Sequence, residues 1–335
     1  MSQRSPSAAP VAPARPEPVR AVFLGTGGFA VPVVEALAGA REVVLVAVVT
    51  APPRPAGRGH RPVGSPVAAW AARRGVPVLT PAGLRAPGSV AELGALDPGL
   101  LVLADYGRLV PQAILDLPRH GALNLHPSLL PRHRGASPVQ AAIAAGDAET
   151  GVTLMRMDAG LDTGPIVAQR AVLLSGDETA PELEARLAEE AASLLRANMR
   201  AWLDGALVER PQPEEGATLT RPLRREDGRL DASRPAVELA RLVRAYRPWP
   251  GTWLETEGGR LAVHAAQATH PPDDGPGQDV GRLVADGDGL ALVTGDGWLH
   301  LLEVQPPGGR RMSAAAYRRG RPAIVGSRVQ PPSVG

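Results

Sequence analysis

The chain of 335 residues contains no cysteine. This absence excludes disulfide bonds, thiolate nucleophiles and cysteine metal sites, and it suits the reducing cytoplasm, where we expect the protein to act. Lysine is also absent, so all 36 basic residues are arginine. The guanidinium group binds phosphate through two parallel hydrogen bonds. With a formal net charge of +2, the composition permits a nucleic-acid partner without requiring one.

Long apolar runs are missing as well. The longest, residues 43–49, is far shorter than the ~20 residues that span a bilayer, so we expect no membrane segment. The first 19 residues hold five prolines and no stretch like the core of a secretion signal, which predicts a disordered tail over residues 1–19. The seven histidines are scattered and no HExxH run occurs, so we expect no catalytic metal.

From residue 21 onward, short apolar runs alternate with helical stretches. Strands are expected at residues 21–24, 43–49, 76–79, 100–104 and 122–125, and helices near residues 31–40 and 66–74. This order predicts an α/β fold with a Rossmann-like, mostly parallel sheet that is covered on both faces. Ligands of such sheets bind beyond the carboxyl ends of the strands, so functional residues should follow a strand directly.

A second domain is expected after a long helix at residues 179–204. We place a catalytic domain at residues 20–207, a linker at 208–222 and a second domain at 223–330. The last part has one helix and then short strands broken by Gly, Asp and Pro, which predicts a small β-barrel. No sustained heptad or unexplained apolar helix stands out, so we expect a monomer.

A glycine-rich turn, GTGG at residues 25–28, follows the first strand and is similar to a dinucleotide-binding turn. The second strand, however, ends at Thr50 without the acid that would hold a ribose hydroxyl. A tight strand-to-helix turn is the favoured interpretation, and a nicotinamide site is the alternative.

The most informative segment is GALNLHPSLLPRHRG, residues 121–135. Asn124 and His126 are two positions apart on a predicted strand, so their side chains lie on the same face. An amide and an imidazole side by side suit attack on a carbonyl, because both can donate to the oxygen as negative charge develops. The alternative is that both side chains only make hydrogen bonds to backbone groups at the end of a sheet and have no part in catalysis.

A second segment, MDAGLDTGP at residues 157–165, places two aspartates in a loop flanked by glycines. Such a loop can bring a carboxylate against His126, where it would hold one tautomer and stabilise the charged ring. The alternative for Asp162 is a turn former.

These residues resemble the family of formyltransferases that use 10-formyltetrahydrofolate. The run from Asn124 to Pro131 and GLDTG at residues 160–164 are similar to the family signature. Five further segments are similar to the branch that formylates methionine on initiator tRNA: RPAGRG (54–59), GDAETGVT (146–153), RPWP (247–250), TGDG (294–297) and LEVQPPGGRRM (302–312). The resemblance runs from about residue 21 to about residue 321.

The resemblance implies a catalytic trio of Asn124, His126 and Asp162. It also implies 10-formyltetrahydrofolate as formyl donor, methionyl initiator tRNA as acceptor, and an OB-like C-terminal barrel that helps to hold the tRNA. Folate-binding positions are implied at Ser128, Leu129, Leu130 and Pro131 and, around the pterin, at Tyr106 and Leu109. Arginines expected to contact tRNA phosphates are Arg54, Arg58, Arg61, Arg310 and Arg311, together with Arg318 and Arg319.

Some residues depart from the family pattern. Pro53 stands where Asp is usual, His60 and Arg61 where lysines are usual, and His133 where Trp or Tyr is usual; Asp105 and Arg108 replace small or apolar residues. These departures concern the folate pocket and the tRNA contacts, not the chemistry. Apart from them, two alternatives stay open. One is a formyltransferase whose acceptor is a small amine, such as an amino sugar nucleotide or glycinamide ribonucleotide, and the other is a non-catalytic tRNA-binding module.

Overall fold

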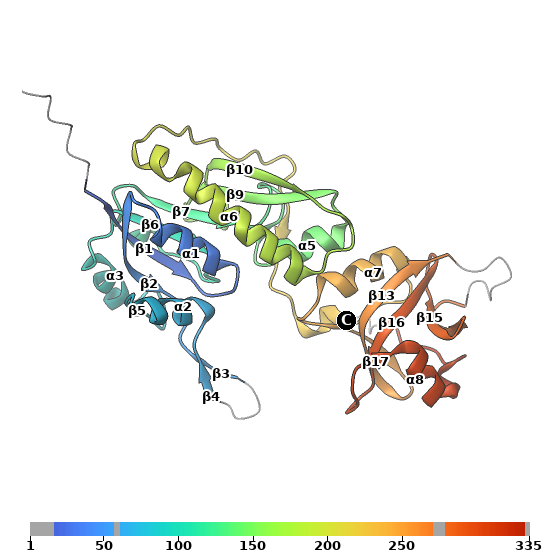
Figure 1. The fold of residues 1–335 in the computed structure, drawn as a ribbon. Coiled ribbons are helices and arrows are strands. Elements are labelled where there is room, and N and C mark those ends of the chain that lie inside the picture. The colour runs from blue at the N-terminus through green and yellow to red at the C-terminus, as the bar shows by residue number, and fades with distance from the viewer. Residues whose placement is uncertain (1–16, 57–60, 271–278, 332–335) are drawn as a thin grey trace, which may run out of the picture.

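The computed structural model describes residues 17–56, 61–270 and 279–331, which form two units side by side (Figure 1). The N-terminal unit is built on a seven-stranded sheet of order β10-β9-β7-β6-β1-β2-β5. Five of its strands pair in parallel: β1 (Val19–Gly25), β2 (Val43–Val49), β5 (Val78–Leu79), β6 (Leu100–Ala104) and β7 (Ala122–His126). The other two, β9 (Glu149–Arg156) and β10 (Ile166–Leu173), add an antiparallel edge. The expected mostly parallel sheet is confirmed.

Helices cover both faces of this sheet, as the alternation of side chains along β1 illustrates. Ala21 and Phe23 are fully buried in the core with helices α1, α2 and α6, whereas Val22 and Leu24 are fully buried on the opposite face with α3 and α4. Burial on both faces explains why the strand is a continuous apolar run. The helices are α1 (Ala30–Ala38), α2 (Pro66–Arg74), α3 (Pro87–Gly94), α4 (Gln112–Leu115), α5 (Pro138–Ala145) and α6 (Ala180–Leu203).

Two predicted regions lie partly outside the described residues. Of the expected tail, residues 1–16 are not described, and Val19 already belongs to β1. The strands β3 (Arg54–Ala56) and β4 (Arg61–Val63) pair as an antiparallel hairpin that projects from the sheet (Figure 1). Arg58 lies outside the described residues, as do the side chains of Arg54 and Arg61, so the expected phosphate contacts there stay predictions.

The C-terminal unit is an antiparallel sheet of order β12-β13-β16-β15-β14, with β17 paired to β16. Its strands are β12 (Thr252–Thr256), β13 (Gly259–Thr269), β14 (Leu283–Asp286), β15 (Gly289–Val293), β16 (Trp298–Gln305) and β17 (Met312–Ser313). Helices α7 (Ala236–Ala245) and α8 (Ala314–Gly320) pack on it through a core that includes Leu239, Leu261 and Tyr317. Two 3-10 turns, η1 (Arg225–Gly228) and η2 (Pro322–Ile324), flank the unit. The expected second domain of short strands is confirmed.

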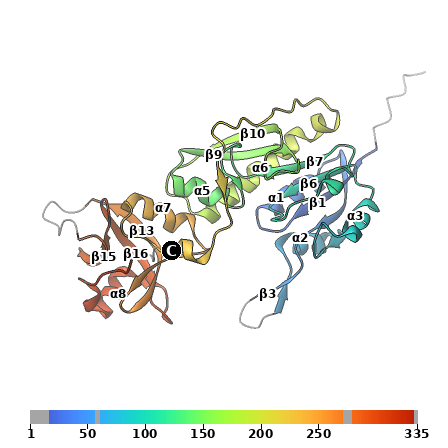
Figure 2. The same cartoon turned by 180° about the vertical axis from the view of Figure 1, so that it is seen from behind.

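The segment between the units, residues 210–222, follows the N-terminal unit closely (Figure 2). The amide of Arg210 donates to the carbonyl of Ile166 at 2.9 Å, and the amide of Ile166 donates back at 2.8 Å. Further along, β11 (Leu219–Thr220) pairs in parallel with β8 (Arg134–Gly135). The segment is therefore hydrogen-bonded to the first unit at both ends. No helix in the described part of the chain is long and apolar enough to cross a membrane.

Candidate active site

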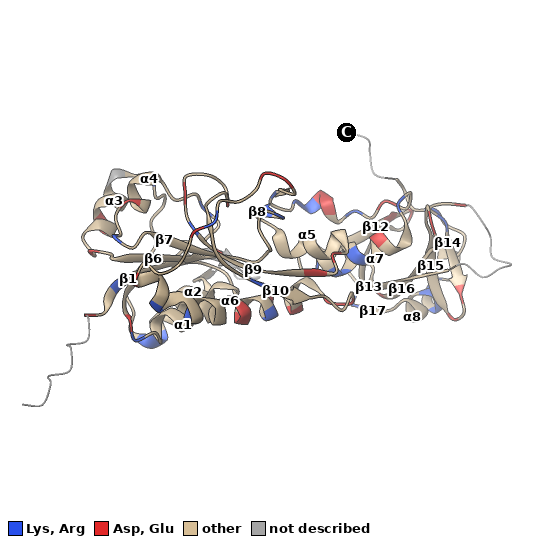
Figure 3. Cartoon of the chain, turned by 90° about the horizontal axis from the view of Figure 1, so that it is seen from above, with Lys and Arg blue, Asp and Glu red and all other residues tan. Residues whose placement is uncertain are grey.

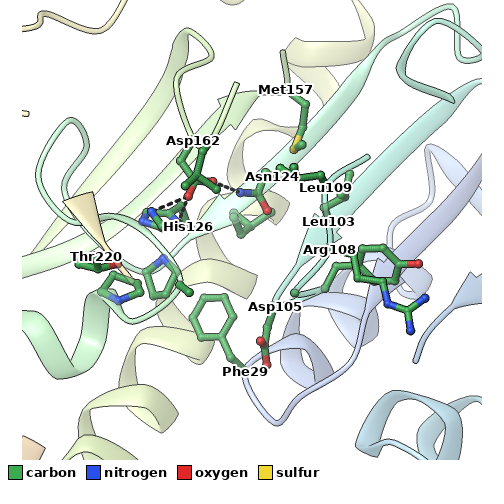
Figure 4. A pocket seen from close by; sticks show the side chains of 18 of the residues that line it. Phe29, Leu103, Asp105, Arg108, Leu109, Asn124, His126, Met157, Asp162 and Thr220 are labelled. Atoms are coloured by element: carbon green, nitrogen blue, oxygen red, sulfur yellow. Dashed lines mark hydrogen bonds and ion pairs between the residues drawn. The ribbon is translucent and has the colours of Figure 1, made fainter. Parts of the chain in front are cut away.

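A pocket of about 470 Å³ lies beyond the carboxyl ends of β6 and β7 (Figure 4). Segments far apart in the sequence form its walls: Phe29 after β1, residues 105–110 after β6, the end of β7, residues 157–162, and Thr220 and Pro222 near β11. This is where a parallel sheet is expected to bind its ligands, because the loops there vary without disturbing the core.

Asn124, His126 and Asp162 meet in this pocket. His126 Nδ1 lies 3.6 Å from Asp162 Oδ2, and Asn124 Nδ2 lies 3.5 Å from Asp162 Oδ1, the outer limit of a hydrogen bond. Figure 4 shows the Asp162 carboxylate pointing toward both side chains. The two segments singled out in the sequence are thus brought together. Because the Asn124 contact is long, its amide is only weakly held and can donate to a ligand.

The orientation of His126 follows from its other ring nitrogen. Its Nε2–H donates to the backbone carbonyl of His133 at 2.9 Å, and the ring is 5% exposed. A carbonyl can only accept, so Nε2 keeps its hydrogen in both charge states of the ring. The proton that His126 gains or loses is therefore at Nδ1, which faces Asp162.

The two aspartates of the loop have different surroundings. Asp162 accepts a hydrogen bond from the amide of Gly135 at 2.8 Å, and its own backbone is left-handed at φ 53°. Asp158 instead accepts from the amide of Gly160 and the hydroxyl of Thr163, at 3.0 and 2.8 Å. Asp158 is therefore a turn former, and Asp162 is the carboxylate placed against His126.

Of the positions implied to bind folate, Tyr106 and Leu109 line the pocket, whereas residues 128–131 do not. The Ser128 hydroxyl is fully buried and donates to the carbonyl of Arg132 at 2.6 Å, and Leu130 packs against Met155 and Ile166. These side chains support the loop from behind the pocket wall. Direct contact between folate and Ser128, Leu129, Leu130 or Pro131 stays a prediction.

A pair of acids that the motifs did not indicate also lines the pocket. Burial and the neighbouring carboxylate of Glu184 raise the pKa of Asp105 to about 6, partly offset by a hydrogen bond from the backbone of Gly27. Burial likewise raises the pKa of Glu184. A Cβ atom on Gly27 would lie 1.8 Å from Asp105 Oδ2, so the glycine-rich turn is shaped around this carboxylate. Only the unusual residue type at Asp105 hinted at this pair.

Comparison with known proteins identifies both units. Residues 19–198 match the formyl transferase family, and residues 222–322 match the formyl transferase C-terminal domain. A methionyl-tRNA formyltransferase of Myxococcus xanthus (strain DK1622) is 46% identical over 310 residues, which cover 92% of this chain and 97% of the relative. One of Roseiflexus sp. (strain RS-1) is 46% identical over 314 residues, 93% of this chain and 95% of the relative. The chain belongs to the methionyl-tRNA formyltransferase family.

Solved structures agree on the fold of this family. The N-formyltransferase from Helicobacter canadensis, in complex with folinic acid and dTDP-3-aminofucose, superposes with a TM-score of 0.64 at 16% identity, covering 88% of this chain and all of the other. At this identity the likeness shows a shared fold. Membership of the methionyl-tRNA formyltransferase family makes the chain a transferase and gives no support to the nicotinamide or the non-catalytic alternative.

Two of the residues that depart from the expected family pattern, Arg108 and His133, have hydrogen-bond partners in this chain. Arg108 Nη1 donates to the carbonyls of Pro81 and Ala82, each at 3.0 Å, and so ties the loop after β6 to its neighbour. His133 Nε2 lies 2.7 Å from Asp147 Oδ2. These side chains brace loops around the pocket.

The arginines expected to bind tRNA in the second unit divide into two groups. Arg311 contacts Glu303 at 3.5 Å and His264 at 2.9 Å, and Arg318 donates to the carbonyls of Gly287 and Gly289. Arg310 and Arg319 are exposed. In the view of Figure 3, basic and acidic residues are interspersed along both units. Contact of any of these arginines with a tRNA phosphate stays a prediction.

Proposed function

We propose that this chain transfers the formyl group of 10-formyltetrahydrofolate to the α-amine of methionyl initiator tRNA. The proposal rests on one observation. Asn124, His126 and Asp162 lie together in one pocket of a protein that belongs to an enzyme family. Similarity to methionyl-tRNA formyltransferases over both units favours the tRNA acceptor over a small amine.

The proposed reaction is a direct transfer. The neutral amine nitrogen attacks the formyl carbon, and the carbonyl oxygen becomes an oxyanion that accepts hydrogen bonds from Asn124 Nδ2 and from Nδ1–H of protonated His126. Asp162 orients His126 and takes the proton of the attacking amine through a water molecule. Collapse of the tetrahedral intermediate re-forms the carbonyl and breaks the bond to the folate nitrogen, which receives that proton from Asp162 through the water molecule and leaves as tetrahydrofolate.

The side chains around the trio fit a folate donor. Tyr106, Leu109 and Leu161 give the pocket an aromatic ring and two exposed apolar side chains that a flat heterocycle can contact. We assign the pterin to this wall. The acceptor end of the tRNA would then enter from the opposite side.

We also propose the working form of the protein. It acts in the cytoplasm as a monomer, with catalysis in residues 20–207, a connecting segment at 208–222 and tRNA contacts in residues 223–330. Sedimentation equilibrium of the purified protein, alone and with tRNA, would test the monomeric state. A dimer would give twice the molar mass of a single chain.

A transfer assay with labelled formyl donor tests the acceptor. The protein is incubated with methionyl initiator tRNA, uncharged initiator tRNA, glycinamide ribonucleotide or an amino sugar nucleotide. We expect label only on the charged tRNA, and alkaline release should give formylmethionine. Label on a small amine alone would refute the proposed acceptor, and label on no acceptor would refute the transfer.

A further inference from the structure

The segment between the two units is hydrogen-bonded to the stretch of chain whose backbone groups hold His126 and Asp162. His126 donates to the carbonyl of His133, and Asp162 accepts from the amide of Gly135. Both groups belong to one short stretch of chain, and its hydrogen-bond partners lie in residues 212–221.

Thr218 fixes the residue that orients His126. Its hydroxyl accepts from the amide of His133 at 2.7 Å, and its carbonyl accepts from the amide of Arg134 at 2.9 Å. His133 has a left-handed backbone at φ 57°, a conformation that non-glycine residues adopt only when their surroundings impose it. Thr218 supplies part of that restraint.

Thr220 fixes the residues on either side of the Asp162 contact. Its hydroxyl donates to the carbonyl of Arg134 at 2.9 Å and accepts from the amide of Ser137 at 3.0 Å. Thr220 also lines the pocket, as Figure 4 shows. The amide of Gly135, which donates to Asp162, therefore lies between two backbone groups that are both hydrogen-bonded to the Thr220 hydroxyl.

Gln212 joins the two loops directly. Its side-chain amide donates to the carbonyls of Asp162 and Gly164 at 2.8 and 2.7 Å, and its oxygen accepts from Arg134 Nε at 3.0 Å. Arg221 lies at the other end of the segment, just before the second unit begins. Its Nη1 donates to Asp227 Oδ2, in η1 of that unit, at 2.8 Å. The segment therefore connects the second unit with the backbone of Asp162, whose side chain is the carboxylate of the trio.

We infer that Gln212, Thr218 and Thr220 are positioning residues, through which the inter-unit segment sets the relative orientation of His126 and Asp162. The inference rests on the proposed function, because it takes these two side chains as the reacting groups. Small displacements of reacting groups cost large factors in rate while leaving substrate contacts in place. Loss of these hydrogen bonds should therefore lower kcat and spare KM.

The test uses the full chain with Thr218→Val, Thr220→Val and Gln212→Met, which remove the hydrogen-bonding groups and nearly preserve size. Rescue variants are Thr218→Ser and Thr220→Ser, which keep the hydroxyl. The matched control is Thr252→Val, at a buried threonine of β12 whose hydroxyl donates to the carbonyl of Val263. We expect each positioning variant to lower kcat about 10-fold with KM for donor and acceptor changed less than about twofold. The serine variants should recover most of the rate, and the control should match wild type.

A second readout needs no acceptor. The 15N chemical shifts of the His126 ring, assigned with a His126→Asn variant, report which nitrogen carries hydrogen. Wild type should show hydrogen on Nε2 of the neutral ring, and the Thr218→Val variant should show a mixture of both tautomers. This measurement separates failure of the inference from failure of the proposed acceptor.

Three results would overturn the inference. They are an unchanged kcat in folded Thr218→Val and Thr220→Val proteins, a loss of rate that Thr252→Val shares, and a His126 tautomer that does not respond to Thr218→Val. If one valine variant fails to fold, the other and Gln212→Met carry the same comparison. If wild type formylates another amine, that amine becomes the acceptor in the kinetic assay.

Discussion

At the scale of single residues, one pocket holds acids in two different environments. Asp162 accepts an amide hydrogen bond and faces His126, whereas Asp105 is enclosed beside Glu184 and its pKa is raised to about 6. Such a difference in surroundings can give two chemically identical carboxyl groups different roles in one site. Asp162 suits an orienting carboxylate, and the raised pKa of Asp105 makes it titrate closer to neutral pH than an ordinary aspartate does.

The raised pKa of Asp105 predicts a pH-dependent stability. Between the ordinary value of 3.8 and about 6 the folded protein binds more protons at this site than the unfolded chain, so its contribution to stability falls as pH rises through that window. Asp105→Asn removes this loss, and asparagine tolerates the φ of 45° found there. We expect the variant to melt a few degrees higher than wild type at pH 7.5 and at the same temperature near pH 3.5.

Thermal unfolding at both pH values measures the effect. Glu189→Gln, at an exposed carboxylate of α6, is the control. A stabilisation by Asp105→Asn of equal size at both pH values would contradict the titration account.

Replacing His126 tests whether the trio is catalytic. His126→Gln should lower kcat by about 10²- to 10⁴-fold, because a proton-transferring and oxyanion-stabilising group is removed. The Kd for initiator tRNA, measured by filter binding, should stay close to that of wild type. A variant that keeps full turnover would favour a role in stability alone.

At the scale of elements, the short parallel pair of β8 and β11 joins the loop that follows β7 to the segment that leads into the second unit. The pair forms because the chain approaches itself closely at Gly135, whose φ is 101°. A Cβ there would lie 2.2 Å from the carbonyl oxygen of Thr220. Only glycine allows β11 to lie at this distance.

Gly135→Ala should therefore separate the two strands. We expect a loss of about 1–3 kcal/mol from the unfavourable backbone conformation, with a further cost for moving the Thr220 carbonyl. Urea denaturation followed by circular dichroism measures it. Gly83→Ala is the control, because a Cβ on Gly83 would meet no atom within 4 Å. Equal midpoints for the two variants would show that β11 adapts without cost.

At the scale of the whole molecule, the two units are joined by more than a covalent link. Helix α5 packs on α7, and Ala144 and Tyr246 contact the cores of both units. Arg241 Nη1 also lies 3.4 Å from the carbonyl of Ala145 at the end of α5. A tRNA bound to the second unit would therefore meet a pocket at a defined position.

If the second unit binds tRNA through phosphates, affinity should fall steeply with salt. Arg310→Ala and Arg319→Ala should each reduce the slope of log Kd against log salt by about 1. Arg200→Ala, at an α6 residue paired with Asp204, should leave the slope unchanged. Affinity that is equal at low and moderate salt in wild type would refute the phosphate contacts.

The sequence by itself determined the features that depend on neighbours along the chain. Short apolar runs between helical stretches predicted the strands β1, β2, β6 and β7, and a spacing of two predicted that Asn124 and His126 share a face. The second domain of short strands followed from its turn residues. These features are local, because hydrophobic periodicity and turn chemistry act over a few residues.

Only the tertiary structure decided which distant groups meet. It brought the Asp162 carboxylate against His126, enclosed Asp105 beside Glu184, buried the hydroxyl of Ser128 against the carbonyl of Arg132, and joined Gln212 to the loop of Asp162. No motif marks Gln212 or Thr220, because their importance lies in hydrogen bonds to backbone atoms, which any residue provides. Such contacts depend on sheet register and on the path of the chain between units, so they exist only once the whole molecule has folded.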